Sequence, residues 1–529
     1  MTYDAVVVGA GFAGMYMLHR LRGLGMSVRA YETGAGVGGT WYWNRYPGAR
    51  CDVESLQYSY SFSDELQREW EWSERYPSQP EILLYAEHVA DRFDLRRDIQ
   101  FETRVTRAAY DETANLWRVE TDRGDRVAAR YLITAVGCLS ASRVPGFPGA
   151  ASFPGPSYHT GRWPHEGVDF TGRRVAVIGT GSSGIQAIPV IAAQAAHVTV
   201  FQRTPNYSLP AHNRPMEPEY QGWFKAGHAG LRTTMRESAA GILSDPNPDS
   251  ALEASEEERA RVFESRWAKG GVSFMASFGD IAVNPEANEI AAEFVRGKIR
   301  EIVTDPEVAE LLSPRNHPIG SKRICVDTGY YATYNRPDVT LVDVRRAPIE
   351  EITPTGVRTA DAEYPADVIV YATGYDALTG PLLAMDLTGK GGLSLRRKWA
   401  AGPRTYLGLM TAGFPNLFTI TGPGSPSVLS NMIVSIEQHV DWITGCLGWL
   451  RDGQVATIDA DPLAEDAWVE HVNEVAGYTL FPRADSWYLG ANIPGKPRVF
   501  MPYAGGVGAY RVLCDQVAAD GYRGFVLSA

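Results

Sequence analysis

Short apolar runs that end in glycine recur along this chain, and each has the length of a buried strand. The first covers residues 3–8 and suits a strand that is buried on both faces of a parallel sheet. A helical pattern follows at about 15–23, and a second strand at 27–31. Strand, helix and strand in this order predict a βαβ unit whose two strands lie parallel in one sheet.

The same order begins again in the middle of the chain. A strand at 174–178 is followed by a helix at 185–193 and by another strand at 198–202. Between 208 and 321 the pattern changes to amphipathic helices, after which strands resume at 339–342. We therefore expect an α/β fold with two Rossmann-like dinucleotide-binding domains and a helical insertion in the second domain.

These changes of pattern predict that neither domain is continuous in sequence. We expect two segments in each domain, with the insertion between the two segments of the second. The predicted boundaries are 1–140 and 377–529 for the first domain, 141–207 and 322–376 for the second, and 208–321 for the insertion. The last segment contains a Gly- and Pro-rich aromatic tail, which we expect to form a mobile loop over the active site.

A glycine-rich turn follows the first strand of each predicted unit. The glycines are Gly9, Gly11 and Gly14 in the first turn and Gly179, Gly181 and Gly184 in the second. Each turn stands between a strand and a helix, which is the context of the dinucleotide-binding fingerprint, where the helix N-terminus receives the pyrophosphate. The alternative for either site is a glycine-rich turn that only connects packed elements.

The residue at the end of the second strand differs between the two units. Glu32 occupies this position in the first unit, and Arg203, followed by Thr204, occupies it in the second. A carboxylate suits a ribose diol, whereas a guanidinium suits a 2′-phosphate because it forms charge-assisted hydrogen bonds. We expect the second domain to prefer NADP(H), although the arginine could also cap a solvated strand end. Since two nicotinamide cofactors would not usefully exchange a hydride, FAD is the simplest ligand for the first domain.

Composition narrows the classes of function. The net charge of −12 argues against a nucleic-acid surface and against a polybasic membrane anchor. The five cysteines are far apart in sequence, so a disulfide framework, a structural zinc site and a redox cysteine pair are not expected. The chain lacks a signal peptide pattern and any apolar stretch of membrane-spanning length. We expect a cytoplasmic protein, a monomer or weak homo-oligomer, that binds no metal, nucleic acid or membrane.

Two further segments combine residues in unusual ways. Residues 38–52 are dense in aromatic side chains among glycines and charges, which suits either a wall for a flat cofactor ring or a loop packed between domains. Residues 153–164 lie between the two glycine-rich turns and follow the pattern F-x-G-x-x-x-H-x-x-x-W-P. The defining residues of that pattern are Phe153, Gly155, His159, Trp163 and Pro164.

The segment 153–164 resembles the fingerprint of type I Baeyer–Villiger monooxygenases, and the flanking glycine motifs lie where that family has them. The resemblance extends over essentially the whole chain and includes residues 38–52 and 421–427. Other flavin monooxygenases share a related F-x-G-x-x-x-H motif but usually lack its Trp-Pro ending, so the discrimination depends on Trp163 and Pro164.

The resemblance implies an enzyme that uses NADPH, FAD and O2 to convert a ketone to an ester or lactone. The implied substrate is an arylalkyl, cyclic or steroidal ketone. A flavin peroxide anion attacks the carbonyl in this chemistry, and the tetrahedral adduct then rearranges. The alternatives are a flavin monooxygenase that oxygenates N or S centres and a flavin-bearing scaffold that binds NADPH without turnover.

The resemblance also implies the residues of the site. It makes Arg323 the cation that stabilises the peroxide and the developing oxyanion, and Asp52 the carboxylate that orients it. The implied FAD contacts, besides the first glycine-rich turn and Glu32, are Thr40, Trp41, Tyr42, Trp43, Arg50, Cys51, Asp52, Tyr58, Val105 and Met432. The implied NADPH contacts, besides the second glycine-rich turn, are Thr180, Ser182, Ser183, Ile185, Gln186, Arg203, Thr204, Lys322, Arg323 and Trp487.

Some assignments leave alternatives open. Without the resemblance, Lys322 and Arg323 would be an ordinary surface pair of basic residues. His159 is either a histidine whose hydrogen bonds are satisfied within a linker or a participant in catalysis. We expect the segment 153–164 to join the two domains and the chemistry to depend on Arg323 and Asp52. Cys138 departs from the family pattern, which affects the shape of the substrate pocket and leaves the reaction type unchanged.

Overall fold

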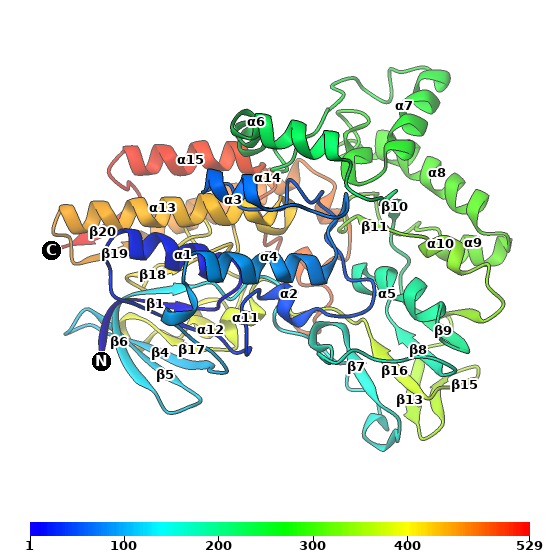
Figure 1. Cartoon of the computed structure of the whole chain (residues 1–529), viewed down its shortest axis with the longest axis horizontal. Helices are drawn as coiled ribbons and strands as arrows, with labels where there is room; N and C mark the ends of the chain where they lie inside the picture. Colours follow the sequence, from blue (N-terminus) through cyan, green and yellow to red (C-terminus); the bar gives the residue numbers. More distant parts are fainter.

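The computed structural model describes residues 1–529. Figure 1 shows two lobes side by side, each built around a sheet, and both chain termini lie at the outer end of the same lobe. That lobe is the first lobe below, and the other is the second lobe. No helix combines the length and the apolar character needed to cross a bilayer.

The sheet of the first lobe has eight strands in the order β17–β4–β5–β6–β1–β2–β3, with β18 beside β6. β1 lies parallel to β2 and β6, whereas β4, β5 and β6 form an antiparallel meander. The strands are β1 (Thr2–Val8), β2 (Val28–Tyr31), β3 (Ile99–Gln100), β4 (Val105–Asp111), β5 (Leu116–Thr121), β6 (Arg126–Thr134), β17 (Asp386–Thr388) and β18 (Leu417–Thr419).

Helices from both ends of the chain cover this sheet. α1 (Phe12–Gly23) packs against α13 (Met432–Asp452), and both helices contribute buried apolar side chains to the same core. In α13 the side chain of Asn431 caps the N-terminus by accepting a hydrogen bond from the Ile433 N–H. α4 (Gln79–Arg92), α14 (Pro462–Gly477) and α15 (Val507–Ala519) complete the layer around this core. The two distant segments predicted for the first domain therefore share one core.

The sheet of the second lobe has five parallel strands in the order β12–β9–β8–β16–β7. Its edge strand β7 belongs to the segment 153–164, and His159 lies opposite Tyr371 in the register with β16. That segment is thus part of the sheet as well as a connection between the lobes. The strands are β7 (Ser157–His159), β8 (Arg174–Ile178), β9 (His197–Gln202), β12 (Val339–Asp343) and β16 (Val368–Tyr371).

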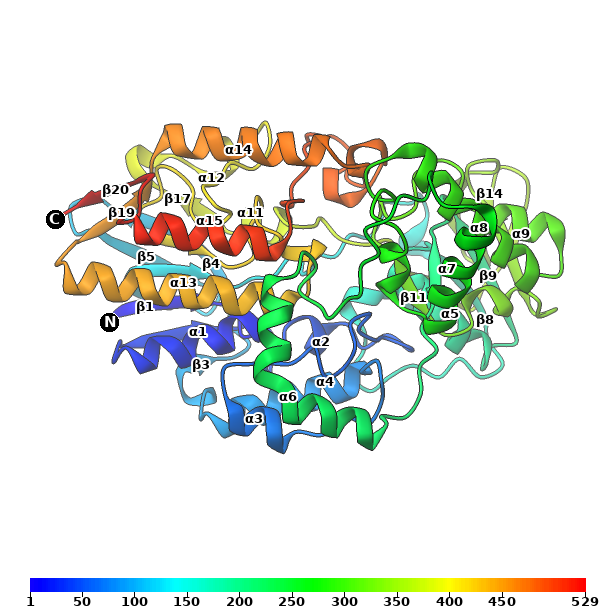
Figure 2. The ribbon, with the colours of Figure 1, turned by 90° about the horizontal axis from the view of Figure 1, so that it is seen from above.

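The predicted helical insertion is divided between the two lobes. Its first helix, α6 (Pro218–Glu237), lies across the first lobe beside α3 (Asp64–Glu69) and α15 (Figure 2). The later helices α7 (Glu256–Lys269), α8 (Pro285–Ile302) and α9 (Pro306–Leu312) cover the second lobe and share its apolar core. A chain segment from the second lobe therefore also contacts the first.

The remaining elements are short. The helices are α2 (Thr40–Trp43), α5 (Ser182–Ala192), α10 (Tyr330–Thr333), α11 (Gly380–Leu383) and α12 (Leu395–Lys398). The strands are β10 (Ser208–Pro210), β11 (Cys325–Asp327), β13 (Ile349–Thr353), β14 (Gly356–Thr359), β15 (Glu363–Pro365), β19 (Thr457–Ala460) and β20 (Phe525–Ser528).

Candidate active site

The two glycine-rich turns have the same backbone geometry. Gly9 has a φ of +106° and Gly179 a φ of +113°, a region that favours glycine. A Cβ atom at either position would overlap the carbonyl oxygen at the end of the neighbouring strand, that of Ala135 or Ala372. No side chain caps the N-terminus of α1 or α5, so their first N–H groups are available to a pyrophosphate. Both turns therefore fit a dinucleotide.

Glu32 connects the end of β2 to the first glycine-rich turn. Its buried carboxylate accepts hydrogen bonds from the N–H groups of Ala10 (2.8 Å) and Gly34 (2.7 Å). Burial raises the pKa of Glu32, and the backbone donors only partly oppose this effect. Glu32 thus holds the turn in shape from the position where the sequence predicts a ribose contact.

Arg203 and Lys322 are neighbouring cations of the second lobe. Burial lowers the pKa of Lys322 and the positive charge of nearby Arg203 lowers it further, while the carboxylate of Asp485 partly opposes both effects. Neither side chain has an ion pair or hydrogen bond within the protein, whereas most arginines of the chain do. The hydroxyl of Thr180 donates to the carbonyl of Thr204 (3.1 Å), which ties the end of β9 to the turn before α5. Two unpaired cations beside a dinucleotide turn fit the 2′-phosphate of NADP(H).

Asp52 and Arg323 form an ion pair, although they are 271 positions apart. The Nε of Arg323 donates to Oδ2 of Asp52 (3.0 Å), and its Nη2 contacts both carboxylate oxygens (2.7 Å each). The remaining Nη1 donates to the carbonyl oxygen of Val428 (2.9 Å). These bonds fix the plane of the guanidinium and join three distant segments of the chain. The pairing implied by the family resemblance is present in the structure.

The electrostatics keep Arg323 charged. Burial alone would lower the pKa of Arg323, but the Asp52 carboxylate, and to a lesser degree Tyr488 and Cys51, raise it above its usual value. Tyr488 is buried against this group: burial raises the pKa of its phenol to about 12, although the charge of Arg323 opposes the rise. Sequence reasoning named Trp487 in this tail but missed Tyr488, whose proximity to Arg323 depends on how the tail folds back.

An apolar wall lies beside Arg323. We define it by the buried side chains of Cys138, Leu378, Val428, Tyr488, Leu489, Phe500 and Met501. The partly buried Leu139, Leu429, Met432 and Trp487 pack against it. The Cys138 thiol contacts the hydroxyl of Ser427 (3.0 Å) and lies 3.4 Å from the carbonyl oxygen of Thr421. A fixed cation beside an apolar wall suits a carbonyl compound with a hydrocarbon frame.

The loop that supports this wall has a strained backbone. Thr421 and Ser427 have φ values of +55° and +40°, which non-glycine residues rarely adopt. Strain of this kind persists only where the surrounding contacts impose it, and it is common in binding sites. The Thr421 N–H donates to Nδ1 of buried His439 (2.8 Å), and this bond holds the loop in place.

The aromatic segment 38–52 packs between the lobes: Trp41 belongs to the apolar core of the first lobe, and Tyr46 and Ala49 belong to that of the second. Trp41 donates its indole N–H to the hydroxyl of Tyr58 (3.0 Å), and both side chains are buried. Arg50 pairs with Glu74 (2.5 Å). Val105 lies in β4 within the apolar cluster on the sheet. The cofactor contacts assigned to these residues stay predictions.

The contacts of His159 support a structural role for the segment 153–164. Its Nδ1 accepts a hydrogen bond from the Gly161 N–H (2.9 Å), and its ring meets Tyr375 edge-on at 5.9 Å. Burial lowers the pKa of His159, its Nε2 is buried without a hydrogen-bond partner, and none of its contacts includes Asp52 or Arg323. Trp163 is buried, and its N–H lies 3.5 Å from the carbonyl oxygen of Trp43 in the first lobe.

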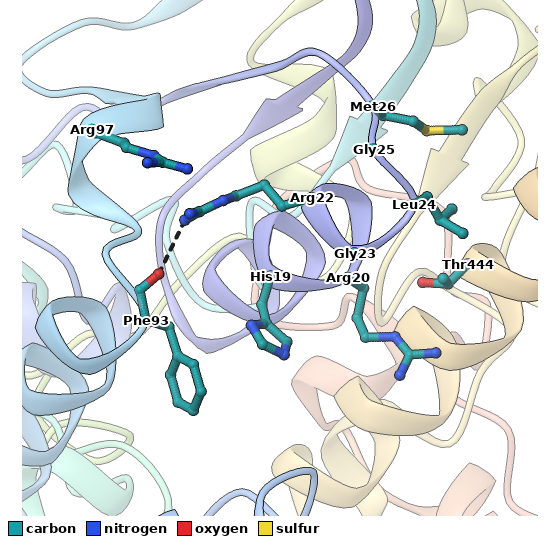
Figure 3. Close-up of a pocket in the computed structure, with 10 residues that line it drawn as sticks. All are labelled: His19, Arg20, Arg22, Gly23, Leu24, Gly25, Met26, Phe93, Arg97 and Thr444. Atoms are coloured by element: carbon teal, nitrogen blue, oxygen red, sulfur yellow. Dashed lines mark hydrogen bonds between the residues drawn. The ribbon is translucent and has the colours of Figure 1, made fainter.

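A hollow of about 810 Å³ lies elsewhere, at the C-terminal end of α1 (Figure 3). It contains none of the predicted site residues. Its three guanidinium groups each have an aspartate partner, in the pairs Arg20–Asp441 (3.6 Å), Arg22–Asp98 (3.6 Å) and Arg97–Asp94 (3.0 Å). Because these charges are already compensated, the hollow lacks the free cation that distinguishes the site around Arg323 and Lys322.

Comparison with known proteins agrees with this geometry. Residues 6–239 match the family model described as pyridine nucleotide-disulphide oxidoreductase. A Baeyer–Villiger monooxygenase of Pseudooceanicola batsensis is 45% identical over 99% of this chain and 96% of its own length. A phenazine N-monooxygenase of Lysobacter antibioticus is 44% identical over 99% of this chain and 97% of its own.

Solved structures give the same result. The structure described as oxidized steroid monooxygenase bound to NADP superposes with a TM-score of 0.96 at 55% identity, and the match covers 100% of both chains. Full-length identity of this size, together with the two dinucleotide turns, leaves no doubt about the fold. The chain belongs to the type I Baeyer–Villiger monooxygenase family.

Proposed function

We propose that this protein oxidises arylalkyl, cyclic or steroidal ketones to esters or lactones with NADPH and O2. The overall reaction consumes one ketone, one O2, one NADPH and one proton, and it yields one ester, NADP⁺ and one water. Bound FAD supplies the oxygen-activating chemistry. The single observation that carries the proposal is the fixed Asp52–Arg323 pair beside the apolar wall.

Arg323 provides positive charge where the reaction develops negative charge. A guanidinium is protonated at every accessible pH, and its hydrogen bonds to the Asp52 carboxylate hold its orientation before the substrate arrives. Such a group stabilises an anionic oxygen nucleophile and the oxyanion formed from a ketone carbonyl. It does not act as a proton donor, so the site favours attack on carbonyl carbon over electrophilic oxygen transfer.

The two lobes divide the cofactors between them. The first glycine-rich turn, Glu32 and the aromatic segment 38–52 are suited to FAD. The second glycine-rich turn, Arg203 and Lys322 are suited to NADPH, since the two cations have no other partner and a 2′-phosphate would relieve their repulsion. The Asp52–Arg323 pair lies where segments from both lobes meet, because Asp52 belongs to the first and Arg323 precedes β11 of the second.

Oxygenation of an aromatic nitrogen is the second candidate function. It rests on the 44% identity to a phenazine N-monooxygenase, which shows that this fold is compatible with that reaction in a relative. The Arg323 environment favours the ketone reaction. A cytoplasmic location and a monomeric or weakly oligomeric state stay predictions.

The test is a product-identified screen of the purified, FAD-loaded protein. Phenylacetone, cyclohexanone, progesterone and phenazine would each be incubated with NADPH in air, and the products separated by gas or liquid chromatography. We expect NADPH consumption to rise with at least one ketone and an ester or lactone to form. N-oxide formation from phenazine without any ester would overturn the proposal in favour of the second candidate.

A further inference from the structure

The first two turns of α5 contact both chain segments that carry the catalytic ion pair. The carboxamide of Gln186 is directed entirely at the segment 38–52. Its Oε1 accepts hydrogen bonds from the Tyr46 hydroxyl (2.8 Å) and the Arg50 N–H (3.4 Å), and its Nε2 donates to the Arg50 carbonyl oxygen (3.0 Å). Arg50 stands two positions before Asp52. One side chain of α5 thus holds the backbone that leads into the catalytic carboxylate.

The segment 38–52 packs closely against α5 around Gln186. Gly48 has a φ of +78°, and a Cβ atom there would overlap the Gln186 carbonyl oxygen and crowd Val190. Tyr46 is 9% exposed, and burial raises the pKa of its phenol to about 12, while the nearby side chain of Ser183 opposes the rise. The Tyr46 hydroxyl therefore lies close to two residues of α5 and donates to one of them, Gln186.

The opposite side of the ion pair also touches α5. The Ser182 hydroxyl lies 3.3 Å from the Cys325 thiol, and Cys325 stands two positions after Arg323. Asn206 donates to the Arg323 carbonyl oxygen (3.0 Å) and also contacts the Cys325 thiol (3.3 Å). The first turn of α5 therefore borders the segments that carry Asp52 and Arg323, and its uncapped N–H groups face the second dinucleotide turn.

We propose that Tyr46 and Gln186 are positioning residues that make the Asp52–Arg323 pair respond to the nucleotide bound at the N-terminus of α5. A dinucleotide on the N–H groups of α5 fixes the first turn of that helix, and the hydrogen bonds of Gln186 extend this order to Arg50 and Asp52. Hydrogen bonds are directional and short, so a small displacement of α5 breaks them and releases the carboxylate. The inference rests on the proposed function in taking NADP(H) as the ligand of α5.

The alternative is that these contacts only stabilise the packing of the two lobes. A structural role predicts that their removal lowers stability without changing how the segment 44–54 responds to the nucleotide. A positioning role predicts that the variants still bind NADP⁺, because the Gln186 carboxamide is already bonded to Tyr46 and Arg50 and is not free for the NADPH contact implied for this residue, but that this segment no longer responds. The two roles therefore differ in a measurement that does not depend on turnover.

The experiment is hydrogen–deuterium exchange of the FAD-loaded protein with and without NADP⁺, read on peptides covering residues 44–54. Wild type, Gln186→Leu and Tyr46→Phe would be compared, with NADP⁺ affinity measured separately by calorimetry. The control is Gln221→Leu, since Gln221 joins α6 to the first lobe by accepting from the Trp72 N–H (3.0 Å) and lies outside this cluster. We expect NADP⁺ to slow hydrogen–deuterium exchange of residues 44–54 in wild type and Gln221→Leu. In Gln186→Leu, the effect of NADP⁺ on this exchange rate should be at least fivefold smaller.

A second readout is the ester formed per NADPH consumed, with hydrogen peroxide as the product of uncoupled turnover. We expect this ratio to fall at least threefold in Gln186→Leu, and by less in Tyr46→Phe, which removes only one hydroxyl. If NADP⁺ leaves exchange of the segment unchanged in wild type, or slows it equally in Gln186→Leu, the inference is overturned. Tyr46→Phe decides the question if Gln186→Leu does not fold. A wild type that forms no ester but shows the exchange response would overturn the proposed function alone.

Discussion

Replacement of Arg323 is the most direct test of the catalytic assignment. The side chain makes three short N–H···O contacts to Asp52 and one to the Val428 carbonyl oxygen, so its position is determined from two directions. Arg323→Ala removes the charge and the hydrogen bonds to Asp52. Arg323→Lys keeps a charge but loses the planar pair of hydrogen bonds, since an ammonium group cannot bind both carboxylate oxygens in one plane.

The expected magnitudes for catalysis and for stability differ. Loss of a preorganised group that stabilises a developing oxyanion costs about 10²- to 10³-fold in kcat, or about 3–4 kcal/mol. Loss of the ion pair leaves the Asp52 carboxylate without a partner, which costs about 3–5 kcal/mol for a buried pair. The Asp52 side chain is 22% exposed, and solvent reduces that cost to about 2 kcal/mol. The loss of transition-state stabilisation is therefore expected to exceed the loss of folding stability by about 1–2 kcal/mol.

Stopped-flow absorbance separates the two half-reactions. We expect NADPH to bleach the bound flavin of Arg323→Ala at a rate within tenfold of wild type, while ester formation falls by at least 10²-fold. The rate of ester formation by Arg323→Lys should lie between the rates of wild type and Arg323→Ala. Asp52→Asn keeps the shape of the side chain, so its rate of ester formation should fall less than that of Arg323→Ala. Ester formation by Arg323→Ala at more than a tenth of the wild-type rate would refute the role of Arg323.

Three further predictions follow from charges outside the catalytic pair. Arg203→Ala should lower the preference for NADPH over NADH, measured as the ratio of kcat/KM values, by about 10- to 100-fold, because one charged hydrogen bond to the 2′-phosphate is lost. Equal use of both cofactors by wild type would contradict the phosphate site. Arg174 lowers the pKa of Asp367 to about 2, so this pair stabilises the fold above pH 4 and its contribution is lost as the pH falls toward 2. Asp367→Asn should lower the stability measured by urea unfolding only slightly at pH 7, because Arg174 is half exposed and solvent screens the pair, and nearly not at all at pH 2. Burial, and to a lesser degree the charge of Lys322, lowers the pKa of His317 to about 3, below its value in the unfolded chain. The unfolded chain therefore binds a proton first as the pH drops below 6.5, and the free energy of unfolding should fall by about 1.4 kcal/mol at pH 5.5. His317→Asn should flatten that decline in denaturant titrations between pH 7.5 and 5.5, and an unchanged slope would exclude His317 as its source.

The position of the ion pair has a consequence for how the enzyme is controlled. Asp52 is the last residue of the aromatic segment 38–52, Arg323 precedes β11, and Val428 leads into α13. Any relative movement of the lobes changes the geometry of the pair. The proposed catalytic role of Arg323 therefore predicts that its orientation depends on the arrangement of both lobes.

Local patterns in the sequence were sufficient for the parts of this protein that are built from neighbours in the chain. The apolar runs, the glycines after them and the residues at the ends of β2 and β9 specify two dinucleotide units, because strand burial, left-handed φ and helix N-termini are properties of contiguous residues. The opposite charges of Glu32 and Arg203 also follow from position within each unit. The family resemblance added Asp52 and Arg323 as partners.

Contacts between distant segments depended on the tertiary structure. Nothing in the periodicity of the chain brings Val428 or Tyr488 to Arg323, directs Gln186 at Arg50, or makes β7 the edge strand beside β16. These contacts arise because two separately specified lobes pack against each other, and packing is decided by the fit of whole surfaces. The sequence by itself determined the fold of each lobe and which cofactor class it suits, and only the tertiary structure decided how the lobes meet to form one site.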